Sequence, residues 1–76
     1  MSSTLRWRPT HTSGNDLPYE LKRALHKRTD GEPVKGEFTE ASIQYLQGLR
    51  DGGVVGADKL IEAIEKHGSV EVWEEF

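Results

Sequence analysis

The side chains of this 76-residue chain that could carry out catalysis or bind a metal are scattered, and none belongs to a recognised motif. His11, His26 and His67 have no i,i+4 partner and no second ligand at a spacing typical of zinc sites. The chain contains no cysteine, which excludes thiolate ligands and disulfides. It also lacks a glycine-rich phosphate loop and a nucleophile elbow. The sequence therefore predicts a protein without catalytic residues, metal ligands or a cofactor.

Charge is distributed unevenly along the chain, and this pattern is the main indication of a binding function. Residues 1–28 contain six Lys or Arg and two Asp or Glu, and residues 29–76 contain four and eleven, so the two halves carry net charges of +4 and −7. Such a separation attracts a charged partner, or it is neutralised where the two halves pack together. Both interpretations stay open at the level of the sequence.

The acidic half predicts a surface for a protein partner. Carboxylates there combine with two aromatic side chains near the end of the chain, and exposed aromatics flanked by charge are typical of interface anchors. The residues expected on this acidic and aromatic face are Asp58, Glu62, Glu65, Glu71, Trp73, Glu74, Glu75 and Phe76. Trp73 is expected to project because Val70 and Val72 occupy the inward register of the same strand. The simpler interpretation is an ordinary solvated acidic surface.

The basic half predicts a second, alternative surface. Its cations could contact nucleic-acid phosphates or an acidic protein surface, and binding to nucleic acid should then weaken steeply with salt. The residues of this basic patch are Arg6, Arg8, Lys22, Arg23, His26, Lys27 and Arg28. The simpler interpretation is a solvated helix face whose cations also favour the negative end of the helix dipole.

Three segments have the residue spacing of amphipathic helices. Leucines at every fourth position predict a first helix over about residues 18–28. A second helix is predicted to begin after Thr39, a suitable N-cap, and to end at the two glycines 52–53. A third is predicted between Gly56 and Gly68, where apolar residues recur at i, i+3, i+4 and i+7.

Two further segments alternate with the period of a β-strand. Apolar and basic residues alternate in TLRWR near the N-terminus, and apolar and acidic residues alternate in SVEVW near the C-terminus. Their opposite charges favour cross-strand pairing. We therefore expect an α+β fold of order β-α-α-α-β, a single small domain over residues 1–76 in which three helices pack with a two-stranded antiparallel ribbon. Residues 1–3 are expected to be flexible, and loops are expected over about 9–16 and 29–37.

The second and third predicted helices raise the alternative of a DNA-reading helix-turn-helix. The exposed side of the third helix carries Asp58, Glu62 and Glu65, which repel phosphates, and no Arg, Asn or Gln lies between Gly56 and Gly68 to read bases. The connection DGGVVG is also longer than the turn of that motif. We expect instead a helical hairpin packed on the core.

These exclusions leave a binding protein as the expected function. No apolar run is long enough for a secretory signal or a membrane span, so a cytoplasmic protein without membrane contact is expected. The first expectation is a small non-enzymatic protein-binding module, an accessory or inhibitory protein that docks on a larger enzyme and resembles proteins encoded by phages or mobile elements. The alternatives are a nucleic-acid-binding accessory protein that uses the basic patch and a self-assembling structural subunit.

Overall fold

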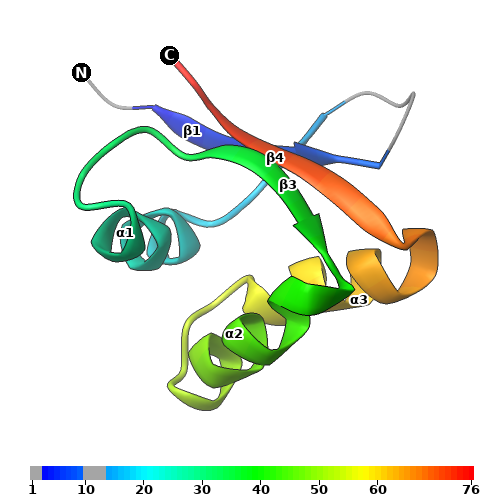
Figure 1. Ribbon diagram of the computed structural model, residues 1–76. Coiled ribbons are helices and arrows are strands. Elements are labelled where there is room, and N and C mark those ends of the chain that lie inside the picture. Colours follow the sequence, from blue (N-terminus) through cyan, green and yellow to red (C-terminus); the bar gives the residue numbers. More distant parts are fainter. Residues whose placement is uncertain (1–2, 10–13) are drawn as a thin grey trace.

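A four-stranded antiparallel sheet forms one layer of the fold, and three helices cover one of its faces (Figure 1). The computed structural model describes residues 3–9 and 14–76. The strands are β1 (Thr4–Arg8), β2 (Asn15–Asp16), β3 (Lys35–Thr39) and β4 (Ser69–Glu75), in the order β2-β1-β4-β3. The prediction of a two-stranded ribbon is therefore wrong, because two more strands flank the terminal pair.

The two terminal strands pair as expected, with Arg6 opposite Trp73 and Arg8 opposite Glu71. The strands that the sequence did not predict, β2 and most of β3, lie in segments expected to be loops, and β3 extends to Thr39, the predicted N-cap of the second helix. Their residues, Asn-Asp in β2 and Lys-Gly-Glu at the start of β3, have no alternation of apolar side chains. They are held by backbone pairing to β1 and β4 at the two edges of the sheet, an interaction that side-chain patterns do not report. Residues 1–2, which were predicted to be flexible, and residues 10–13, which were predicted to be part of a loop, lie outside the described part of the chain.

The helices have nearly the predicted bounds: α1 spans Tyr19–Arg28, α2 spans Glu40–Asp51 and α3 spans Ala57–His67. The Thr39 side chain caps α2 by accepting a hydrogen bond from the Ala41 N–H at 3.3 Å, and the Ser42 hydroxyl accepts one from the Thr39 N–H. Gly56, which precedes α3, has a φ of 99° and lies where an added Cβ would be 2.7 Å from Pro18. A glycine is therefore needed at this position for both its conformation and its close contact.

The core lies between the sheet and the helix layer. Leu5, Val70 and Val72 point from the two central strands toward the helices and are almost fully buried. The helices contribute further fully buried side chains: Leu21, Leu25, Leu46, Leu60 and Ile64. The opposite face of the sheet has no helix over it among the described residues and carries charged side chains, as antiparallel sheets commonly do. Within the same residues, no helix is both long and apolar enough to cross a membrane.

Candidate binding surface

The residues predicted to form one acidic and aromatic face lie on several different surfaces. Asp58, Glu62 and Glu65 are exposed on α3, on the helix side of the sheet. Glu71, Trp73 and Glu75 share the opposite, open face of the sheet, because residues at alternate positions of a strand point the same way. Phe76 follows β4 and is 79% exposed. Glu74 belongs to neither surface, and the whole set does not form one continuous face.

Glu74 is instead buried beneath α1, with a side chain that is only 1% exposed. Its Oε2 accepts a hydrogen bond from the Ser3 hydroxyl at 2.5 Å, and its Oε1 accepts one from the Val34 N–H at 2.9 Å. The His26 Nε2 forms an ion pair with the same Oε1. The alternation of β4 accounts for this placement, because Glu74 follows Val70 and Val72 at two-residue steps and so shares their inward face.

The surroundings of Glu74 keep its carboxyl group charged. Burial alone raises the pKa of Glu74, because the charged form loses hydration. The hydrogen bonds from Ser3, the Val34 N–H and His26, together with the charge of His26, outweigh burial and bring the pKa of Glu74 below its ordinary value. The four groups form a polar cluster that fixes the C-terminal strand to α1.

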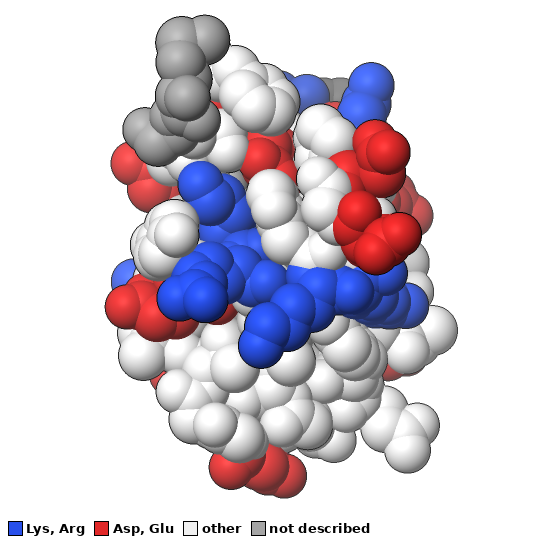
Figure 2. Space-filling view, turned by 90° about the vertical axis from the view of Figure 1, so that its left-hand side faces the viewer, with Lys and Arg blue, Asp and Glu red and all other residues white. Residues whose placement is uncertain are grey.

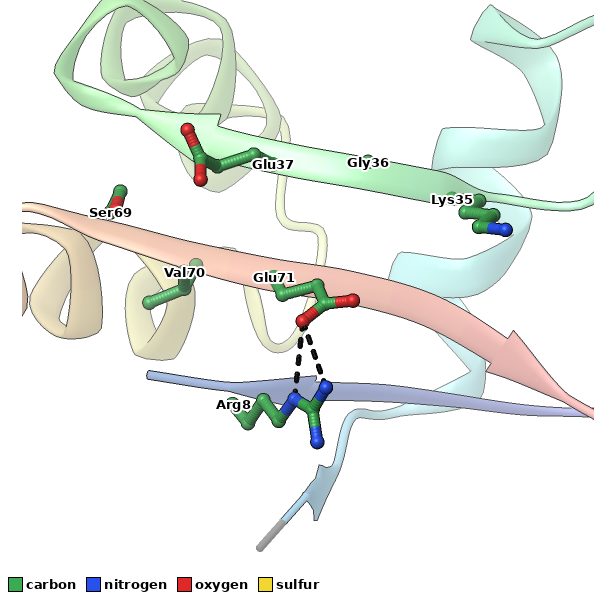
Figure 3. Close-up of a pocket in the computed structure, with 7 residues that line it drawn as sticks. All are labelled: Arg8, Lys35, Gly36, Glu37, Ser69, Val70 and Glu71. Atoms are coloured by element: carbon green, nitrogen blue, oxygen red, sulfur yellow. Dashed lines mark hydrogen bonds and ion pairs between the residues drawn. The ribbon is translucent and has the colours of Figure 1, made fainter. Parts of the chain in front are cut away.

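Two of the predicted basic residues, Arg6 and Arg8, are neutralised on the open face of the sheet. Arg6 forms ion pairs with Asp16 at 3.1 Å and with Glu75 at 3.2 Å. Arg8 and Glu71 point toward each other from β1 and β4 (Figure 3), with an Nη2–Oε2 distance of 3.1 Å. For these residues the two oppositely charged halves of the chain neutralise each other within the fold.

Trp73 lies among these pairs and is partly covered. The Arg8 guanidinium lies 5.2 Å from the centre of its ring. The side of the ring near Gly14 is so close that a Cβ at that glycine would be 2.9 Å from a ring carbon. Trp73 is therefore on the open face, as predicted, but it is packed against its neighbours instead of projecting from them.

The remaining five predicted basic residues belong to α1, where they have two different orientations. Lys22 and His26 point inward: Lys22 is buried and its Nζ donates to the Ser3 carbonyl at 2.7 Å, while His26 contacts Glu74. Arg23, Lys27 and Arg28 are exposed. On the side of the molecule that carries α1, Lys and Arg side chains form a continuous band (Figure 2).

Two tyrosines accompany the exposed cations of α1. Tyr19 is 61% exposed and, together with Arg23 and Lys27, follows the four-residue spacing of one helix face. The Lys22 ammonium and the Arg23 guanidinium lie 5.1 and 6.0 Å from its ring centre. On α2, the Tyr45 ring lies 4.3 Å from the Arg28 guanidinium. We call the set Tyr19, Arg23, Lys27, Arg28 and Tyr45 the α1 face.

An open groove of about 520 Å³ adjoins the α1 face. Its lining includes Tyr19, Arg23, Lys27 and Phe76. The sequence predicted the cations of this region but not its tyrosines, although the spacing of Tyr19 relative to Arg23 and Lys27 was a usable signal. The placement of Tyr45 beside Arg28 depends on the packing of α2 near α1 and had no local signal.

Metal ligands do not converge anywhere in the described residues: no three His, Asp or Glu side chains are arranged to hold an ion. His11 lies outside the described part of the chain. His26 is joined to Glu74, and His67 is exposed at the end of α3. The surface with the clearest binding character is thus the α1 face. No protein-family model, curated protein or solved structure matches this chain with significant similarity.

Proposed function

We propose that this protein is a non-enzymatic binding module that docks through its α1 face on an acidic surface of a larger protein. The proposal depends on one observation: the exposed cations of α1 are not neutralised by carboxylates in the described part of the chain. Within the described residues, Arg23, Lys27 and Arg28 have no carboxylate within the 4.0 Å of an ion pair, whereas Arg6 and Arg8 are both neutralised. Cations without an internal carboxylate partner are available to pair with an external carboxylate.

The composition of the α1 face supports a protein partner. Tyrosine and arginine are enriched among the residues that contribute most to protein–protein affinity. The contacts of Lys22 and Arg23 with Tyr19, and of Arg28 with Tyr45, hold these side chains close together, which lowers the entropy lost on binding.

The surrounding charges favour a protein over a nucleic acid. Exposed carboxylates flank the α1 face at both ends, Glu20 in the first turn of α1 and Asp30 just beyond its last turn. The whole chain has a net charge of −3. Both features repel a long polyanion, whose binding depends on many phosphate contacts, whereas a local acidic patch on a folded protein can be matched to three cations. The action we propose is that of an accessory or inhibitory protein in the cytoplasm, which covers a surface of its partner.

The test compares capture of partners by the tagged protein and by two double variants. Arg23→Glu with Arg28→Glu reverses the charge of the α1 face. Lys59→Glu with Lys66→Glu is the matched control, because it makes the same charge change at exposed positions of α3. Each protein is incubated with a bacterial lysate, with and without nuclease, at low and high salt, and retained proteins are identified by mass spectrometry.

We expect a protein that is retained by the wild type and the control after nuclease treatment but is lost with the α1 variant. The purified partner should then bind the α1 variant at least about tenfold more weakly, a loss of about 1.4 kcal/mol. Equal retention by all three proteins would contradict the proposed surface. Retention that disappears with nuclease would instead favour nucleic acid as the partner.

A further inference from the structure

One side of the β3 backbone has no partner strand in the described part of the chain, because β3 is an edge of the sheet. In an antiparallel pair, residues that exchange backbone hydrogen bonds alternate with residues that do not. The Glu74 N–H donates to the Val34 carbonyl at 3.0 Å. By the same alternation, the backbone N–H and C=O groups of Gly36 and Phe38, the even-numbered residues of β3, point toward β4. The N–H and C=O groups of Lys35 and Glu37 therefore point outward, away from the sheet.

Gly36 lies between these two residues and is not explained by the fold of a single chain. A Cβ added there would meet no atom within 4 Å, and its φ does not lie in the positive region that favours glycine. Glycine weakens the interior of a strand, and it often marks a place where another backbone approaches closely. The edge of β3 thus combines outward-pointing backbone groups with a residue suited to close approach.

We propose that β3 pairs antiparallel with β3 of a second copy of this chain, with Gly36 at the centre of the pair. Lys35 of each copy then lies opposite Glu37 of the other. These two residue pairs exchange four backbone hydrogen bonds, since both residues point their backbone groups outward. Lys35 and Glu37 are exposed and lie on the open face of the sheet (Figure 3), so each residue pair also forms a cross-strand ion pair.

The neighbouring two-fold registers are unfavourable. A shift of the centre to Lys35 places two lysines directly opposite each other, and a shift to Glu37 does the same with two glutamates, both of which are destabilising. A centre midway between two adjacent residues places Lys35 or Glu37 opposite Gly36 of the other copy. The backbone groups of Gly36 point toward β4, so no hydrogen bonds form between these residues. Among registers centred within residues 35–37, the alternating charges of β3 therefore favour the one centred on Gly36, and they oppose unspecific edge pairing.

The neighbours of β3 limit the length of the paired segment. Pro33 has no N–H to donate. The N–H of Thr39 is already bonded to the Ser42 hydroxyl at 3.3 Å. The contact is therefore short, and it joins two four-stranded sheets into one continuous sheet of eight strands. Because opposite residues point to the same side of a sheet, the helices of both copies lie on one side of it. A short contact of this kind predicts a weak dimer that forms in a concentration-dependent way.

The test uses charge reversal at the two residues and measures mass by sedimentation equilibrium from about 10 μM to 1 mM, a range that covers weak association. Lys35→Glu places glutamates opposite each other in a dimer, and Glu37→Lys places lysines opposite each other. Lys59→Glu and Glu62→Lys, at exposed positions of α3, are the matched controls.

We expect the wild type and both controls to dimerise with rising concentration. Each β3 variant alone should dimerise at least about tenfold more weakly. An equimolar mixture of the Lys35→Glu and Glu37→Lys proteins should regain the wild-type association, because every facing pair is again of opposite charge. A wild type that stays monomeric at 1 mM, unaffected single variants, or a mixture that fails to associate would each overturn the proposal. None of these measurements depends on the partner of the α1 face.

Discussion

Removing the buried carboxylate of Glu74 should destabilise the fold by an amount that its contacts define. In Glu74→Ala the Val34 N–H, which is buried, loses its acceptor, at a cost of about 1–3 kcal/mol. Ser3 and His26 are only partly buried and can be rehydrated, so their loss adds less. We expect Glu74→Ala to lower the free energy of unfolding by about 2–3 kcal/mol. Glu74→Gln, which keeps one acceptor oxygen but no charge, should lower it by about 1–2 kcal/mol, because hydrogen bonds to charged groups are roughly twice as strong as neutral ones.

The pH dependence of this loss tests the charge itself. The pKa of Glu74 in the folded protein lies below its ordinary value, so the folded state holds the charged carboxylate more tightly than the unfolded state does. Its contribution is complete above the unfolded pKa of about 4.3 and is lost as the pH falls through the lower folded pKa. Glutamine does not titrate. The difference in stability between the wild type and Glu74→Gln should therefore shrink between about pH 5.5 and pH 3.

Urea unfolding followed by tryptophan fluorescence measures this difference at each pH, since Trp7 and Trp73 both lie in the sheet. The other carboxylates titrate in both proteins, so their effects largely cancel in the comparison. If Glu74→Gln were as stable as the wild type near neutral pH, the carboxylate would not be held as a charged acceptor. A difference that stays constant down to pH 3 would refute the lowered pKa.

Two further changes test the local structure. Gly56→Ala should lower the free energy of unfolding by about 2–5 kcal/mol, because the residue would have to keep a positive φ and its Cβ would collide with Pro18. Gly68→Ala, at a φ of 86° with no atom near the added Cβ, should lower it by only about 1–2 kcal/mol. Equal losses of stability in urea unfolding would argue against the close contact at Gly56. Thr39→Ala should lower the free energy of unfolding by about 1 kcal/mol through loss of the cap of α2, and Thr39→Ser should keep most of the wild-type stability. The measurement is urea unfolding followed by circular dichroism. A Thr39→Ala protein as stable as the wild type would show that the cap contributes nothing.

The helices were predictable because their signals are local. The fourfold leucine spacing of α1 and the Thr39 cap of α2 act within a few residues of each other, and the structure places both helices within about one residue of the predicted ends. The pairing of the two terminal strands was also predictable, since alternating apolar side chains and opposite charges mark both strands. These features depend on backbone geometry and side-chain period, which a single sequence contains.

The edge strands were not predictable from the same patterns. Lys35, Gly36 and Glu37 have neither apolar alternation nor high β-propensity. They form a strand because the chain returns beside β4, where the backbone groups of β4 on that side would otherwise lack partners. Asn15 and Asp16 form β2 for the same reason beside β1.

The sequence alone determined the inventory of charges and the faces of the local elements, and only the tertiary structure decided which charges are available for binding. Seven basic residues looked equivalent along the chain. The pairing of strands from opposite ends brings Glu71 to Arg8, and the packing of α1 on the sheet brings Glu74 to His26. Arg23 and its neighbours on the α1 face receive no such partner among the described residues. Electrostatic neutralisation depends on distances of a few ångströms between residues far apart in sequence, and only folding sets those distances.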